Sequence, residues 1–290
     1  MGRRREAAVH GLVLLDKEPG WTSHDVVARL RRELGTRQVG HSGTLDPDAT
    51  GLLVVAVGNG TRLLRFLGDM DKTYTCEIVL GSTTDTLDDS GTVTKTYDVA
   101  SVDLDLARDI ARSHLTGEIM QVPPMVSALH HEGRRLHELA REGIEVERDA
   151  RPVRVEEFTL DATGNPTVLS ARIVCGAGTY VRVLGADLGE MLGSGAHIRA
   201  LRRTGIGPWS ATEACTVEAP VVRPLADLVR HLNSHELDAA AVDDTRFGRV
   251  RPVWDDDGPW VGVDEAGEIV AVFEEWRDGL AKPTVVFGGR

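Results

Sequence analysis

The sequence predicts an α+β fold, and three observations support this prediction. Apolar residues alternate with a period of two in some segments and recur at helical spacing in others, so strands and helices both occur. They follow one another without a regular strand–helix–strand period, which disfavours a doubly wound parallel sheet. The chain has 290 residues, 41% hydrophobic and 27% charged, enough for a large core without disulfides or metals.

Strands are predicted first from short apolar runs and from clean alternation. The apolar run at 51–57 is typical of a strand buried on both faces, whereas Tyr74, Cys76, Ile78 and Leu80 share one face of an alternating strand. The predicted strands of the larger part of the chain are 12–15, 51–57, 73–80, 167–175 and 197–203.

Helices are predicted from apolar spacing together with capping residues. Thr22 or Ser23 caps a helix that ends at Gly35. Further helices are expected at 104–115 and at 136–142 before Gly143. We expect Thr179 to cap a fourth helix, whose buried face would carry the apolar residues Val181, Leu184, Leu188 and Met191.

The character of the chain changes near residue 220. Prolines appear, and short strands at 261–263, 269–273 and 284–287 are separated by acidic turns. We therefore predict a larger domain at 1–222 and a small β-rich domain at 223–290.

Composition and missing motifs exclude several classes of protein. The net charge of −12 argues against a generic polyanion binder, although arginines gather locally between residues 29 and 37 and between residues 199 and 203. The sequence has no P-loop, dinucleotide-binding, HExxH or GxSxG motif, and Asp85–Asp89 lacks the calcium-loop pattern. A metal at Asp85–Asp89 is therefore disfavoured.

Export and membrane insertion are also disfavoured. Arg3–Arg5 followed by Leu12–Leu15 imitates a signal peptide, but His10 interrupts the apolar part and no cleavage site follows. No apolar run approaches the ~18 residues of a membrane span. The three cysteines are far apart, so we expect a cytoplasmic protein without disulfides.

The strongest candidate for a catalytic loop is the segment Gly40–Gly51, which precedes the predicted strand 51–57. Its glycines allow tight turns, and Pro47 biases Asp46 toward an extended conformation, so a short loop presents one carboxylate rigidly. An ordinary Asp-Pro turn is the alternative interpretation of this loop alone.

Gly40–Gly51 closely resembles the catalytic loop of the TruB family of tRNA pseudouridine synthases, G-H-x-G-x-L-D-P-x-A-x-G. Further segments resemble other motifs of this family, in the family's order: Leu14–Ser23, Asp71–Tyr74, Gly81–Asp88, Gln121–Ala128, Gly178–Arg182 and Leu201–Arg203. The resemblance covers about residues 11–205. Val126 and His137 depart from it, because the family usually has aromatic residues there.

The resemblance implies a pseudouridine-synthase-like fold: a mixed, mainly antiparallel sheet flanked by helices, with a reduced PUA-like C-terminal domain. It also implies a monomeric cytoplasmic enzyme that isomerises uridine 55 in the T loop of tRNA to pseudouridine, without cofactor. The tRNA T stem-loop would be the partner. No membrane and no metal would be involved.

The resemblance also assigns roles to residues. Asp46 would be the nucleophile or base, Arg182 would keep it ionised and oriented, and Tyr74 would stack on the uracil and help to remove the C5 proton. His41 would fill the space left by the flipped base, and Tyr180 and Leu201 would complete the walls. Candidate phosphate contacts are the cations Lys17, Arg134, Arg135, Arg202 and Arg203.

Two alternatives stay open at this point. One is a non-catalytic tRNA-binding or tRNA-folding protein on the same scaffold. The other is a retaining glycosidase that pairs Asp46 with Asp48 or Asp88, because such enzymes place two carboxylates about 5 Å apart. The low aromatic content of 4% disfavours a sugar-binding cleft.

Overall fold

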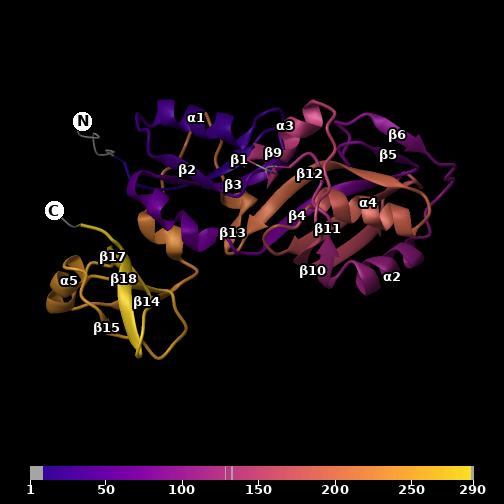
Figure 1. Cartoon of the computed structure of the whole chain (residues 1–290). Helices are drawn as coiled ribbons and strands as arrows, with labels where there is room; N and C mark the ends of the chain where they lie inside the picture. Colours follow the sequence, from indigo (N-terminus) through magenta and orange to yellow (C-terminus); the bar gives the residue numbers. More distant parts are fainter. Residues whose placement is uncertain (1–8, 128, 132, 289–290) are drawn as a thin grey trace.

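One large sheet dominates the computed structural model, which describes residues 9–127, 129–131 and 133–288 (Figure 1). The segment Arg3–Arg5 lies outside the described residues. The order across the sheet is β1 (Gly11–Lys17), β3 (Thr50–Val57), β12 (Ala196–Ile206), β4 (Lys72–Leu80), β11 (Val168–Cys175), β10 (Arg151–Ala162) and β7 (Gly117–Gln121). β2 (Val39–Ser42) adds to β3, and β13 (Trp209–Ser210) adds to β12.

All neighbours in this sheet pair antiparallel except β3 and β12, which run parallel. Their pairing has only two register partners, Arg202 with Thr50 and Arg203 with Gly51. The strand set β1–β2–β3 and the larger set from β12 to β7 therefore meet at a narrow joint.

Five α-helices and several short elements complete the described residues. The helices are α1 (Ser23–Glu33), α2 (Leu104–His114), α3 (Leu136–Arg141), α4 (Val181–Met191) and α5 (Ala239–Arg246). Two small hairpins pair β5 (Ser82–Thr84) with β6 (Val93–Thr96) and β8 (His130–His131) with β9 (Arg134–Arg135). The 3-10 helices are η1 (Gly58–Leu67), η2 (Ala211–Glu213) and η3 (Leu225–Val229).

The continuous apolar run of β3 is explained by burial on both faces. Val55 and its alternate neighbours pack under α1, whereas Val54 and its alternate neighbours contact η1, η3 and the C-terminal sheet. A strand covered on both sides has no solvent face and shows no polar alternation.

The C-terminal part is β-rich, as predicted. Its five-stranded sheet has the order β14 (Asn233–Glu236), β16 (Trp260–Val263), β17 (Ile269–Glu275), β18 (Leu280–Val286) and β15 (Arg251–Pro252). Leu228 and Val229, which precede this sheet, belong to the cluster that joins it to β1 and β3. The boundary at residues 222 and 223 stays a prediction.

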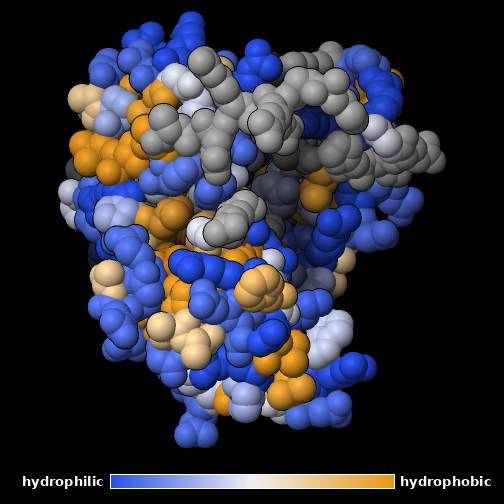
Figure 2. All heavy atoms as spheres, turned by 90° about the vertical axis from the view of Figure 1, so that its left-hand side faces the viewer, coloured by the Kyte–Doolittle hydropathy of each residue, from blue (hydrophilic) through white to orange (hydrophobic). Residues whose placement is uncertain are grey.

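Apolar side chains are not confined to the core. In Figure 2 they form separate patches between hydrophilic side chains on the face that includes the C-terminal sheet. None of the helices in the described residues is long and apolar enough to cross a membrane.

The α+β prediction is confirmed, and most predicted elements occur within a few residues of their predicted bounds. α1 begins with a capping box, in which Thr22 Oγ1 accepts from the Asp25 N–H and the Asp25 carboxylate accepts from the Thr22 N–H. Gly35 follows the helix with a φ of 62°.

Two details of α4 were predicted wrongly. The N-cap is Tyr180 rather than Thr179, and it makes no side-chain capping bond. Met191 is half exposed instead of buried with Leu184 and Leu188, and the next residue, Leu192, packs against the core in its place.

Candidate active site

A pocket of about 590 Å³ opens near the joint between the two strand sets. That volume suits a small ligand such as a nucleoside. It is lined by the loop between β2 and β3, the N-terminus of α1, the start of α4, and side chains of β4 and β12. Five of the predicted site residues line this one pocket: Asp46, Tyr74, Tyr180, Arg182 and Leu201.

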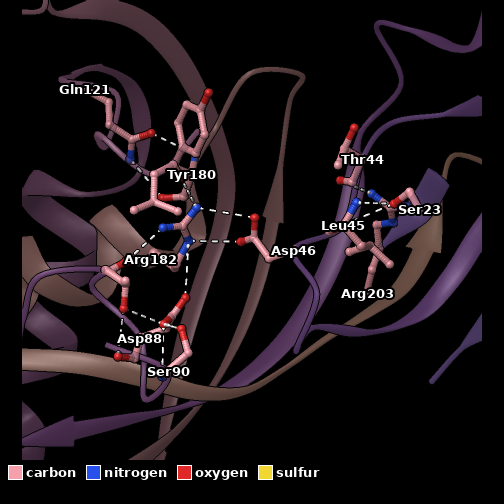
Figure 3. Close-up of polar contacts among 12 residues, drawn as sticks. Ser23, Thr44, Leu45, Asp46, Asp88, Ser90, Gln121, Tyr180, Arg182 and Arg203 are labelled. Carbon is pink, nitrogen blue, oxygen red and sulfur yellow. Dashed lines mark hydrogen bonds and ion pairs between the residues drawn. The ribbon is translucent and has the colours of Figure 1, made fainter. Parts of the chain in front are cut away.

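Asp46 and Arg182 form a two-point ion pair, in which the carboxylate faces the guanidinium (Figure 3). The distance from Arg182 Nε to Asp46 Oδ2 is 3.0 Å, and that from Nη2 to Oδ1 is 3.4 Å. The Arg182 side chain is 3% exposed, whereas that of Asp46 is 40% exposed. The two parallel contacts, which we call the Arg182 fork, therefore hold the carboxylate on its buried side and leave its other side open to the pocket.

The remaining donors of Arg182 are fixed by backbone carbonyls. Nη1 donates to the Thr86 carbonyl at 2.8 Å and Nη2 to the Val126 carbonyl at 2.7 Å. Val126 thus contributes through its backbone, which does not depend on an aromatic side chain. These contacts fix the plane of the guanidinium before any substrate arrives.

Asp88 adds a second negative charge, 3.7 Å from Arg182 Nε. Its other oxygen accepts from the Thr86 hydroxyl at 2.6 Å and from the Ser90 N–H at 3.1 Å (Figure 3). Asp88 does not line the pocket, so its carboxylate supports Arg182 from outside the cavity.

The loop that carries Asp46 is anchored at several points. The Ser23 hydroxyl accepts from the Leu45 N–H at 3.0 Å. Arg203, 1% exposed, donates to the Gly43 carbonyl at 3.1 Å and to Leu52 at 2.8 Å. Lys17, wholly buried, donates to the Pro47 carbonyl at 2.7 Å. Asp46 therefore stands on a loop with little freedom to move.

Most of the cations proposed as phosphate contacts bind carbonyls or carboxylates of the protein itself. The Lys17 ammonium also donates to the Glu18 and Trp21 carbonyls, and burial lowers its pKa to about 8. Arg202 forms a two-point pair with Asp16, and Arg134 pairs with Glu142. Since Lys17 and Arg203 are buried, the structure places them as anchors of the loop and not at a phosphate-binding surface.

Arg135 is the exception among these cations, because it is exposed and lines the pocket.

Tyr74 and Leu201 lie on neighbouring strands and form one wall of the pocket. The Tyr74 ring packs against the same apolar cluster as Leu201, as the alternation of β4 predicts. Burial raises the pKa of Tyr74, while the charge of Arg203 acts in the opposite direction. At neutral pH the phenol therefore carries its proton.

Tyr180 is positioned by Gln121, the first residue of the motif Gln121–Ala128, to which the sequence analysis assigned no role. The Tyr180 N–H donates to Gln121 Oε1 at 2.8 Å, and Gln121 Nε2 donates to the Tyr180 carbonyl at 3.2 Å. This buried amide takes the place of a local cap at the start of α4. The motif marks Gln121 itself, but its contact with Tyr180 has no local signal, because the two residues are 59 positions apart.

His41 lies on β2 beside the pocket, and it is not among the lining residues. Its ring meets that of His24 edge to face, with centroids 5.8 Å apart, and His24 does line the pocket. Burial lowers the pKa of His41, so the ring is neutral at pH 7. The side chain of His137 lies outside the described residues.

Asp46 is the only carboxylate among the described residues that line the pocket. Within that part of the chain, no group of three or more His, Cys, Asp or Glu residues is arranged to hold a metal. The pocket thus combines one oriented carboxylate with cations and aromatic rings.

Comparisons with known proteins show the family to which this chain belongs. A family model described as the N-terminal domain of TruB family pseudouridylate synthase matches residues 31–181, and one for the tRNA pseudouridylate synthase B C-terminal domain matches residues 182–239. The tRNA pseudouridine synthase B of Thermobifida fusca is 43% identical over 96% of this chain and 99% of its own. That of Mycobacterium bovis is 39% identical over 91% and 92%.

A solved structure with the same fold is a chain of a Cbf5–Nop10–Gar1 complex. Its TM-score is 0.72 at 25% identity, and the match covers 97% of this chain and 85% of that one. Sequence, fold and the arrangement of the pocket lead to one conclusion: the chain belongs to the TruB family of pseudouridylate synthases.

Proposed function

We propose that this enzyme converts uridine 55 in the T loop of tRNA to pseudouridine in the cytoplasm, with Asp46 as its reactive group. One observation supports this most strongly: the pocket has a single described carboxylate, held in two-point contact by a buried arginine. The isomerisation adds no water to the nucleoside, so it does not need the second carboxylate with which glycosidases activate a water molecule.

Asp46 acts on the uridine while Arg182 holds the carboxylate in place through its two-point contact. The carboxylate attacks either the ribose C1′ or the uracil C6, or it removes a ribose proton to give a glycal. In each route the bond from N1 to C1′ breaks, the uracil turns, and C5 joins C1′. The proton then leaves C5 and one is taken up at N1, so the product is an isomer of the substrate.

The neighbouring rings fit the remaining steps. Tyr74 stacks on the uracil, and its hydroxyl borders the position of C5 and relays the proton that leaves. Tyr180 and Leu201 form the other walls. A uridine within a folded loop must be flipped out to enter the pocket, at a cost of a few kcal/mol. His41, neutral and beside the pocket, stacks in the space that the base leaves.

A retaining glycosidase is disfavoured, because it needs a second carboxylate in the pocket and neither candidate for that role lines it. Asp88 is hydrogen bonded to Thr86 and Ser90 outside the pocket, and Asp48 does not line the pocket either. A protein that only binds or folds tRNA would not need a carboxylate aligned by a buried guanidinium.

The test is to incubate the purified protein with a tRNA transcript and to map pseudouridine at each uridine. We expect one product, at position 55, and none when that position carries cytidine. Turnover should be unchanged by EDTA. Modification at another uridine would overturn the assigned position, and tRNA binding without any product would favour the non-catalytic alternative.

A further inference from the structure

We infer that an exposed basic surface beside the pocket binds the phosphate backbone of the RNA strand that continues from the target nucleotide. This surface, which we call the α1–β2 basic face, consists of His24, Arg31, Arg32 and Arg37. The inference rests on the proposed function, since that function brings RNA to the pocket.

The α1–β2 basic face begins at the mouth of the pocket. His24 is exposed, lines the pocket and lies on the first turn of α1. Arg32 lies eight residues further along the helix, which corresponds to about 12 Å at 1.5 Å per residue. β2 returns beside the helix, so that Arg31 Nη2 reaches the Val39 carbonyl at 3.0 Å and His24 meets His41. The face therefore extends outward from the catalytic loop.

Two arginines of this face have no anionic partner in the part of the chain that the structure describes. Arg32 and Arg37 are exposed, and no described carboxylate lies within ion-pair distance of either guanidinium. Arg29, on the same helix, instead pairs with Glu33 at 2.8 Å. The chain has a net charge of −12, so exposed arginines that form no described ion pair indicate a surface that binds an anionic partner.

Positive charge outweighs negative charge at this face. Glu33 is paired with Arg29 at 2.8 Å, whereas Asp25 is exposed and stays negative, because hydrogen bonds from the Thr22 N–H and hydroxyl lower the pKa of its carboxyl. The segment 34–42, which includes β2, contains no acidic residue. Such a field attracts phosphates to one side of an otherwise acidic molecule.

The surrounding surface favours a polar partner over an apolar one. In Figure 1, α1 lies along the upper edge of the molecule, and apart from Ala28 its exposed residues are all charged or polar. Arg135 lines the pocket from the hairpin before α3, so cations border the mouth from two elements. A strand leaving the pocket along α1 meets arginines that are free to bind phosphate.

The test compares Arg32→Gln/Arg37→Gln with Arg29→Gln in the full-length chain. Binding of unmodified tRNA is measured against salt concentration in the Asp46→Asn background, and kcat and KM are measured in the otherwise native enzyme. Each lost phosphate contact should lower the salt slope by about 0.7–0.9. We expect a loss of about 1.5 for the double variant and a KM raised about two- to fivefold per arginine, with kcat retained.

The Arg29→Gln variant controls for charge, because it removes one positive charge from the same helix. It should change the slope by less than a third of the effect of the double variant. Equal effects in the control, or an unchanged slope in the double variant, would overturn the inference. If wild-type protein forms no pseudouridine, the proposed function fails instead, and the binding measurement still reports on the surface.

Discussion

Replacement of Arg182 by lysine tests whether the fork, and not the positive charge alone, makes Asp46 reactive. The guanidinium meets three acceptors in different directions: the Asp46 carboxylate at 3.0 Å, the Thr86 carbonyl at 2.8 Å and the Val126 carbonyl at 2.7 Å. An ammonium on a flexible stem cannot reproduce this planar set of donors.

The expected magnitude follows from these contacts. A part-buried carbonyl left without its donor costs about 1–3 kcal/mol, and at least one is lost, so the free energy of unfolding should fall by at least about 1–3 kcal/mol. A carboxylate displaced by about 1 Å costs on the order of 100-fold in rate. Arg182→Lys should therefore lower the single-turnover rate at least ~100-fold while the chain still folds.

The assay is pseudouridine formation under single turnover, together with urea unfolding to measure stability. Arg199→Lys is the matched control, because Arg199 forms an exposed pair with Glu77 and should show nearly wild-type rate and stability. An Arg182→Lys enzyme with more than about a tenth of the wild-type rate would refute the role assigned to the fork.

Tyr74→Phe keeps the ring and removes the hydroxyl, so kcat should fall ~100-fold or more with KM nearly unchanged; a wild-type kcat would remove Tyr74 from the chemistry. Asp187 has its pKa raised to about 6 by burial, from 3.8, so the folded state holds its proton more tightly and stability is lost as pH rises from about 4 to 6. Asp187→Asn should thus raise stability at pH 7 by about 1–2 kcal/mol, after discounting the full shift of ~3 kcal/mol for partial exposure, and should give no gain at pH 4 in urea unfolding. A gain of equal size at both pH values would contradict this origin.

Local patterns predicted the elements that place Asp46 and Tyr74. The capping box of α1 and the apolar run of β3 are both local, and they bracket the catalytic loop. β10 was not predicted, although it has twelve residues. Its buried residues switch from Val153 and Val155 to Phe158 and Leu160, because a bulge between Val155 and Glu157 shifts the alternation by one position.

Sequence patterns did not predict which cations are buried and which face solvent. Lys17 and Arg203 lie in motifs that suggest contact with RNA, but both are buried and donate to carbonyls of the loop. Gln121, which fixes Tyr180, acts across 59 residues. A pattern gives the type of a side chain, but whether a cation faces solvent or a buried carbonyl depends on the packing of distant segments.

Substitution of Asp46 by asparagine gives the most direct test, since it preserves shape and removes the charge that Arg182 aligns. Product formation should fall below about a hundredth of the wild-type rate, with the Kd for tRNA changed less than about twofold. A variant that still forms pseudouridine above about a hundredth of the wild-type rate would contradict the account.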